Sequence, residues 1–467
     1  MRAPRWFAPT LLAAALAAPA LPAGATDLVD AWRGAQQHDL DYAAARAAQQ
    51  AGAARRGQAS ALWRPTVVLS GAAGVAGSDT AVTGAQFSAP GFGTSDGVAF
   101  NTSVNHGTLG RWALSASLPL VSRERDAQGR QLTLSADVAD LQWQDARQTL
   151  MLTTAQRYFD VVLAQESLRV LRQQQAAVDH ALAEARDRYR LGDVPVTDTH
   201  EAAARSEAIA AQRLALETDL QLKQAAFTDA TGLQPDAAQM LLPASDAAPL
   251  DTPDLAYWLS QAAAHNLLLR TRIDAVEVAR QEAAKTSAAL SPSVDLVAQV
   301  GNERLSGSGS FDAGGGASNR SGNRMIGLQL SVPLYSGGMR SARQDEAQRG
   351  IDQAQAQAAR TRQQIELQTR AAWLGLTVGA GRVQALSQAL DASRLRLDAT
   401  RLGRQVGDRT TLDLLNAEND AASAELALVQ ARVDLLTNRL RLAALAGRLD
   451  EAALQSVNAS LQAPGGR

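Results

Sequence analysis

The sequence has no cysteine, and aromatic residues make up only 4% of its 467 positions. Without cysteine the chain can form no disulfide framework, no thiol nucleophile and no cysteine-based zinc site. So few aromatics argue against a large globular core, whereas the abundance of Ala, Gln, Arg and Leu is typical of long helices packed closely through small residues. The formal charge of −2 gives no indication of a nucleic-acid partner.

Patterns of catalytic residues are also missing. The five histidines, at 38, 106, 180, 200 and 265, are scattered, and none forms a His-x-x-x-His pair. The stretch "GSGSFDAGGG" is not followed by the Gly-Lys-Ser/Thr of a phosphate-binding loop. We therefore expect no enzyme activity, no catalytic residue, no metal site and no cofactor.

A long apolar run occurs only near the N-terminus. There "LLAAALAAPAL" follows the basic "MRAPRW" and precedes "AGA" at 23–25, an order that predicts a secretory signal peptide over residues 1–25. The alternative, a transmembrane anchor, is disfavoured because the run is short and Pro19 and Pro22 interrupt it. No later stretch approaches the roughly 18 apolar residues of a spanning helix, so we expect any membrane crossing to use strands.

The rest of the sequence contains an internal duplication. The turns "LGDVPVTDTHEAA" and "VGDRTTLDLLNAE" contain Gly192 and Gly407, which are 407 − 192 = 215 positions apart. The same separation relates Tyr158 to Trp373, Asp193 to Asp408, Asp198 to Asp413, Ala202 to Ala417, and Gly232 to Gly447. Upstream, the separation is 265 − 38 = 227 between His38 and His265. We expect a first repeat over 26–252, with a longer insertion between its strands, a second over 253–450 and a C-terminal tail over 451–467.

Each repeat begins with an Ala-rich pattern that predicts one helix of some 35 residues, over about 27–62 and 254–289. Period-two alternation then predicts two strands per repeat, at about 66–76 and 111–120, and at about 293–302 and 325–334. The Gly/Ser-rich stretches 77–110 and 301–324 are typical of exposed loops. The residues expected to share one face of each strand are Trp112, Leu114, Ala116 and Leu118; Val294, Leu296, Ala298 and Val300; and Ile326, Leu328, Leu330 and Val332.

After the strands of each repeat comes a helical pattern of about 65 residues without proline, in which apolar residues recur at heptad spacing. A helix of this length would be on the order of 100 Å long. Each pattern ends at a Gly-Asp turn, where glycine can adopt the left-handed conformation that stops a helix, and a second helix returns. The two units are therefore predicted to be antiparallel coiled-coil hairpins with tips at about 190–198 and 405–413.

Four strands per chain cannot close by themselves, and open strand edges are not tolerated in lipid. We therefore expect an oligomer that closes a barrel. Three copies would supply twelve strands, although the number three does not follow from the strand count.

The duplication, the strand pairs, "VPLYSGG" before a long helix and "VGDRTTLDLLNAE" at its tip resemble the TolC-type outer membrane factor family. The resemblance covers nearly the whole mature chain. It implies a homotrimer, mainly α, whose twelve-stranded β-barrel in the outer membrane of a Gram-negative cell continues into a periplasmic α-barrel. It also implies an exit duct for type I protein secretion or tripartite efflux. Its partners would be outer membrane lipid, a periplasmic adaptor (membrane fusion protein) and an inner-membrane ABC exporter or proton-driven pump.

The family places acidic rings inside its periplasmic entrance, which implies a pore constriction at Asp413. The second ring position carries Asn416 here, and Asp420, one turn deeper on the same helix face, is a candidate replacement. An acidic ring attracts cations and repels anions at a narrow point. The alternative is that these acids only interact favourably with the N-terminus of their helix.

The resemblance also implies closed-state contacts between the tips. Arg409 matches a family arginine that bonds to the opposite hairpin, where Thr197 and Asp198 would be its partners. An aromatic residue of the family is replaced by Arg404, so an Arg404–Asp198 contact is a further candidate; the alternative is a weak surface charge pair. Adaptor docking is expected at the tip residues Gly192, Asp193, Val194, Gly407 and Asp408.

Two rival functions remain. A structural or adhesive coiled-coil protein of the periplasm or cell surface would explain the heptads and the signal peptide, but not the duplicated strands. A general diffusion porin would need many more strands and far fewer helices. The cargo and the energy source of the partner do not follow from the sequence.

Overall fold

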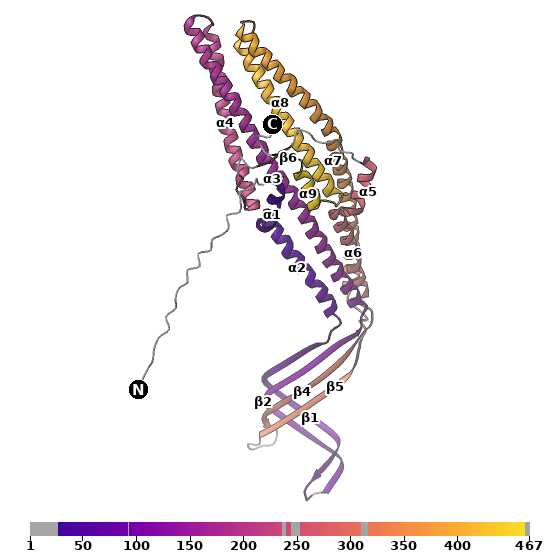
Figure 1. Cartoon of the computed structure of the whole chain (residues 1–467). Coiled ribbons are helices and arrows are strands. Elements are labelled where there is room, and N and C mark those ends of the chain that lie inside the picture. Colours follow the sequence, from indigo (N-terminus) through magenta and orange to yellow (C-terminus); the bar gives the residue numbers. More distant parts are fainter. Residues whose placement is uncertain (1–26, 92, 236–239, 244–252, 310–315, 463–467) are drawn as a thin grey trace, which may run out of the picture.

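The computed structural model describes residues 27–91, 93–235, 240–243, 253–309 and 316–462. The predicted signal peptide at 1–25 lies outside these residues. The chain is elongated, with a four-stranded sheet at one end and the tips of two helical hairpins at the other (Figure 1). Within the described ranges, no helix combines the length and the apolar character needed to cross a membrane.

The two repeats have the same order of elements. The first consists of α1 (Leu28–His38), α2 (Leu40–Ala61), β1 (Thr66–Ala89), β2 (Gly93–Val121), α3 (Arg123–Leu191) and α4 (Val196–Thr231). The second consists of α5 (Leu255–His265), α6 (Leu267–Ala288), β4 (Ser293–Gly309), β5 (Gly316–Ser331), α7 (Met339–Gln405) and α8 (Thr411–Leu445). The remaining elements are β3 (Leu242–Pro243), α9 (Glu451–Asn458) and β6 (Leu461–Gln462).

The first helix of each repeat, predicted as one piece, is two helices. Asp39 ends α1 in an extended conformation and starts α2, because its side chain accepts a hydrogen bond from the Tyr42 N–H at 2.8 Å. Asn266 does the same between α5 and α6 through the Leu269 N–H at 2.9 Å. Asp and Asn are preferred N-cap residues, so the break was readable from the sequence but was hidden by the continuous Ala-rich pattern.

The expected C-terminal tail over 451–467 contains folded elements. Asp450 caps α9 by accepting a hydrogen bond from the Ala453 N–H at 2.8 Å. Leu454 and Val457, three residues apart, are fully buried in one core cluster with Leu28 and Trp32 of α1. The short strand β6 pairs with β3. This segment therefore packs against α1, the first helix of the first repeat.

The strands extend far into the stretches 77–110 and 301–324 that were predicted to be loops. The β4–β5 ladder is continuous from the pair Ser293↔Ser331 to the pair Ser308↔Gly316. Backbone hydrogen bonds carry such a ladder regardless of side-chain polarity. Alternation of apolar and polar residues, the signal used for the prediction, therefore detects only the part of each strand that has an apolar face.

The sheet has the order β1-β2-β4-β5 and all its pairs are antiparallel. Its register confirms that the predicted apolar residues of β2, β4 and β5 share one face, since Leu118 opposes Leu296, which in turn opposes Leu328. Val332, also predicted there, lies just beyond the end of β5 at Ser331. We call this surface the apolar face. Many of its large side chains are uncovered, since Leu69 is 72% exposed and Leu328 is 69% exposed, whereas Leu118 and Leu296 are half-buried. The apolar face consists of Val67, Leu69, Trp112, Leu114, Ala116, Leu118, Val294, Leu296, Ala298, Val300, Ile326, Leu328 and Leu330.

The main helical core lies where the elements of the two repeats meet. Tyr158, Phe159 and Phe227 are fully buried there, and the Tyr158 hydroxyl donates to the Leu241 carbonyl at 3.2 Å. The same hydroxyl accepts from the Leu241 N–H at 2.8 Å. Burial raises the pKa of the Tyr158 phenol, so it stays protonated and can fill both roles.

Two duplicated glycines allow the returning helices to meet the short helices. Gly232 ends α4 with φ +71° and lies against the His38 ring, at the end of α1. Gly447, just after α8, has φ +67°, and a Cβ there would lie 2.2 Å from the His265 carbonyl oxygen, at the end of α5. The duplicated glycines and histidines are therefore the contacts at which each returning helix meets the short first helix of its own repeat.

Replacing Gly447 with alanine is expected to destabilise the protein by about 2 kcal/mol or more, because the left-handed conformation and the steric overlap both oppose a Cβ. The midpoint of thermal unfolding, followed by circular dichroism, should fall. Gly57→Ala, inside α2 four residues before its end and with no atom near the new Cβ, is the matched control and should stabilise by roughly 0.5 kcal/mol. A Gly447→Ala protein as stable as the parent would contradict this account of the joint.

Candidate functional site at the hairpin tips

Both hairpins turn through the same backbone motif. Gly192 has φ +82° and Gly407 has φ +85°, the left-handed conformation that glycine adopts without strain. The Asp193 N–H donates to the Arg188 carbonyl at 2.9 Å, and 215 positions later the Asp408 N–H donates to the Gly403 carbonyl at 2.8 Å. This six-residue closure is the Schellman motif, so the repeated Gly-Asp is explained by the need to stop two very long helices.

The expected docking residues lie on the outside of these turns. Gly192, Asp193, Gly407 and Asp408 are exposed, and Val194 is half-buried. Sequence reasoning missed two apolar residues beside them. Leu191 and Val406 stand at equivalent positions directly before the glycines and are 77% and 74% exposed. Their separation of 406 − 191 = 215 was the signal that would have found them.

The returning helices begin differently in the two hairpins. At the second tip, Thr410 is the N-cap, and its hydroxyl accepts from the Asp413 N–H at 3.1 Å. The Asp413 carboxylate accepts in return from the Thr410 N–H at 3.0 Å, which completes a capping box. At the first tip, the equivalent N-cap is Pro195, which makes no side-chain cap.

This difference leaves Asp198 and Asp413 in different states, although the duplication makes them equivalent. Pro195 has neither an N–H nor a hydroxyl to offer, so Asp198 cannot form the capping box that Asp413 forms. In the part of the chain that the structure describes, the Asp198 side chain has no hydrogen bond and no ion pair. Asp198 is therefore, unlike Asp413, a carboxylate that is available to a partner at the tips.

Asp413, the first predicted pore residue, is held as a carboxylate. Hydrogen bonds from the Thr410 N–H and hydroxyl lower its pKa, and the positive charges of Arg409 and Arg396 act in the same direction. Both bonds end on Oδ2, and the described residues place no donor on Oδ1. The capping role weighed as an alternative is present, and it is compatible with a pore role because one oxygen remains free.

The other two predicted pore residues differ from each other. Asn416 is exposed. Asp420 forms an ion pair with Arg396 of α7 at 2.7 Å, so much of its charge is compensated. Asp420 is therefore a weaker replacement for the second acidic ring than its spacing indicated.

The predicted gate arginines are also placed differently. Arg404 is only 8% exposed and forms an ion pair with Glu184 of α3 at 2.8 Å, so its partner within the chain is Glu184 rather than Asp198. Arg409 is exposed, and no ion pair joins it to Asp198 within the described residues of one chain. Glu184 was missed because it precedes the tip by two helical turns.

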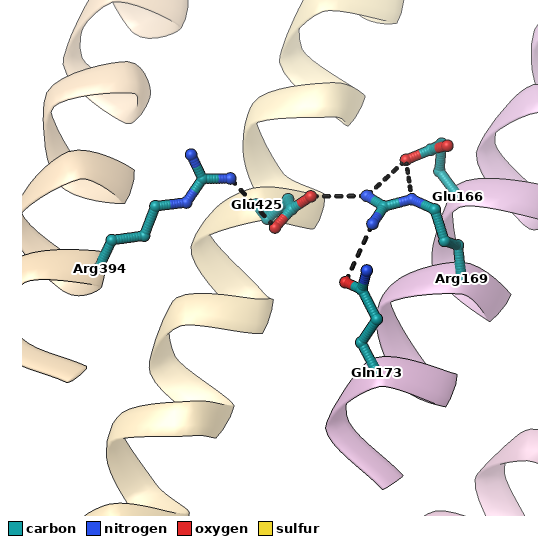
Figure 2. A network of polar contacts seen from close by, with 5 residues as sticks. All are labelled: Glu166, Arg169, Gln173, Arg394 and Glu425. Atoms are coloured by element: carbon teal, nitrogen blue, oxygen red, sulfur yellow. Dashed lines mark hydrogen bonds and ion pairs between the residues drawn. The ribbon is translucent and has the colours of Figure 1, made fainter. Parts of the chain in front are cut away.

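Farther from the tips, a polar network joins the two hairpins. Figure 2 shows the Arg169 guanidinium of α3 between Glu166 on its own helix, at 2.8 Å, and Glu425 of α8, at 2.6 Å. Gln173 accepts from Arg169 at 3.0 Å, and Arg394 of α7 reaches Glu425 at 3.4 Å. Because two charges of each sign are brought together beside the buried Glu166, removing one would leave another uncompensated.

The sequence profile of the outer membrane efflux protein family matches residues 33–233 and 258–448. These two segments are the two repeats. The chain belongs to this family. Among the curated members that it resembles is the outer membrane protein TolC of Escherichia coli K12, with 29% identity over 363 residues, 75% of this chain and 73% of TolC.

Another relative within the outer membrane efflux protein family matches almost from end to end. The proteases secretion protein PrtF of Dickeya chrysanthemi is 28% identical over 450 residues, which cover 94% of this chain and 92% of PrtF. The fold is also that of the Campylobacter jejuni CmeC outer membrane channel, with a TM-score of 0.71 at 15% identity over 94% of this chain and 90% of CmeC.

Thr410→Ala should weaken the start of α8 and raise the rate of tryptic cleavage at the second tip by about five-fold, in line with the loss of an N-cap. Thr410→Ser keeps the hydroxyl and should be cleaved at the parental rate.

Because the pKa of Asp413 is lowered in the folded protein, the contribution of its carboxylate to the stability of the tip should be complete above the ordinary carboxyl pKa. It should be lost only as the pH falls through the lowered value. Equal cleavage of the alanine and serine variants would contradict the cap.

Proposed function

We propose that this protein is the outer membrane exit duct of a type I protein secretion or tripartite efflux system. One observation carries the proposal: an uncovered apolar face lies at one end of the molecule, and two polar tips lie at the other (Figure 1). The helices α3 and α7 between them have 69 and 67 residues, which is roughly 100 Å at 1.5 Å per residue. Such a molecule can sit in one membrane and reach far from it.

The sheet supports a trimer. Its outer strands β1 and β5 have no partner on one side among the strands of the four-stranded sheet, and a lipid environment does not tolerate such edges. Pairing of β5 with β1 of a neighbouring copy removes both edges, and three copies close a twelve-stranded barrel with the apolar face outward. The helices would then form a periplasmic α-barrel below the outer membrane of a Gram-negative cell.

The tips are the proposed docking site for the partners. Leu191 and Val406 add an apolar contact beside the exposed Asp193 and Asp408, and such a mixture suits a protein surface better than a lipid one. The partners would be a periplasmic adaptor and an inner-membrane ABC exporter or proton-driven pump. The similarity to PrtF, a proteases secretion protein, over most of both chains supports protein cargo. The rival, a structural coiled-coil protein, would need no apolar sheet.

At the pore entrance, we assign the constriction to Asp413, whose free oxygen would form a ring of three in the trimer. The closed state would depend on two links. Arg404 joins Glu184 within one chain, and the exposed Arg409 would reach the free Asp198, near Thr197, of a neighbouring copy. Docking would break these links and release the second hairpin.

Glu184→Gln should raise the open fraction of single channels in planar bilayers by about two- to five-fold, because the buried Arg404 loses its charge partner. Glu201→Gln is the matched control, since Glu201 is exposed on α4 near the same tip and has no ion pair among the described residues. An unchanged open fraction in the Glu184 variant, or an equal rise in the control, would show that this ion pair does not hold the closed state.

Asp408→Cys provides the test of the function, because the chain has no other cysteine. Cross-linking in intact cells followed by mass spectrometry should capture an adaptor. Co-capture of an ABC exporter would assign protein secretion, and co-capture of a proton-driven pump would assign efflux. Ser308→Cys, in β4 at the far end of the molecule, is the control and should capture neither. If the Asp408 thiol is accessible and yet captures no inner-membrane-anchored partner, the duct is wrong and the structural rival gains support.

A further inference from the structure

Three arginines lie at the border of the apolar face that is farther from the helices. Arg304 of β4 stands directly opposite Arg320 of β5, and Arg324 stands opposite Val300. The β4–β5 register is continuous, so alternation places all three on the apolar face rather than on the other side of the sheet. All three are exposed.

These arginines are unpaired among the residues that the structure describes. The described residues provide no hydrogen bond or ion pair to any of them, and two like charges directly opposite each other on a sheet are destabilising. The nearby acid Glu303 lies on the other face, opposite Arg111. The sheet therefore presents positive charge without compensation.

A neighbouring copy would not supply the missing carboxylate. In the proposed trimer, β5 pairs with β1 of the next protomer. The part of β1 that carries the apolar face, "TVVLSGAAGVA" at 66–76, contains no charged residue. Asp79, the one acid farther along β1, already accepts a hydrogen bond from the Ser103 hydroxyl of β2. The compensating charge must then come from outside the protein.

The neighbours of the arginines mark a membrane interface. Trp112, 48% exposed, stands opposite Asn302 on the same face, one step before Arg304 along β4. Moving toward the helices, the face continues with Leu114 and Val300 and then with aliphatic residues only. An apolar band bordered by an aromatic residue and then by basic ones is the order found where strands leave the hydrocarbon for the headgroups.

We propose that Arg304, Arg320 and Arg324 bind the phosphates of a phosphorylated glycolipid headgroup, of the lipid A type, in the leaflet farther from the helices. Guanidinium groups bind phosphate oxygens in bidentate fashion, and two phosphates on one headgroup can engage two neighbouring arginines. The long side chains let Arg324, one row inside the border, extend to the same level. This inference rests on the proposed function, because it requires the sheet to lie in the outer membrane.

The test uses the purified full-length protein in detergent, titrated with bisphosphorylated lipid A and followed by native mass spectrometry. Arg304→Ser and Arg320→Ser should each weaken binding by about five-fold, and the double variant by about 25-fold. Arg111→Ser is the matched control, because it removes the same charge at a neighbouring level on the opposite face, and its affinity should stay within about two-fold. Dephosphorylated lipid A should bind no better to the parent protein than to the double variant.

Equal affinity for the two lipids, or an equal loss in Arg111→Ser, would overturn the proposal. Displacement of the lipid by equimolar inorganic phosphate would also overturn it, because the site would then be a general anion site. Should the double variant fail to assemble, the single variants decide. Channel conductance is recorded for every variant, so that failure of this inference, with conductance intact, is distinguished from failure of the duct itself.

Discussion

A sheet that cannot be complete in one chain is the constraint on which the rest of the structure depends. Four antiparallel strands leave two edges open, and their apolar face has nothing to cover it in the monomer. Water penalises the face and lipid penalises the edges, so only association in a membrane satisfies both. In the proposed trimer, the helices would leave the same end of every copy and run side by side away from the membrane.

Duplication then supplies matching parts, and single residues make them unequal. The two turns share a Schellman closure down to equivalent hydrogen bonds. At the start of each returning helix, the N-cap residue determines the state of the acid three residues later. Pro195 leaves Asp198 without a cap bond, whereas Thr410 binds Asp413 in a capping box. In the gate that we propose, this asymmetry would matter, since Asp198 would accept a bond from a neighbouring copy and the capped Asp413 would supply negative charge at the pore entrance.

The two repeats are held together by polar contacts of graded strength. Near the middle of the helices, Arg169 and Glu425 form part of a network beside a buried carboxylate, which is costly to break one member at a time. Near the tips, Arg404 has one partner that is partly open to solvent. The hairpins are therefore joined more firmly toward the sheet than at the tips, which is compatible with the proposed opening at the tips.

The sequence by itself determined the elements whose signal is local and repeated. Heptads, the Gly-Asp turns and the period-two strands can be recognised in the sequence because each residue's role depends on neighbours a few positions away. The fixed spacing of 215 residues between equivalent positions shows that the two Gly-Asp turns are not a chance resemblance. The breaks at Asp39 and Asn266 were local too, but continuous helix propensity masked them. The polar halves of the strands left no alternation to read, because their stability comes from backbone pairing.

Only the tertiary structure decided which charged side chains form ion pairs with one another. Glu184 and Arg404 are 404 − 184 = 220 positions apart, and nothing in either local sequence indicates that α3 and α7 bring them together. The same holds for Asp420, whose spacing marks it as a pore residue until Arg396 is seen beside it. Pairwise electrostatics depends on distances of a few ångström, and such distances exist only once the helices have packed.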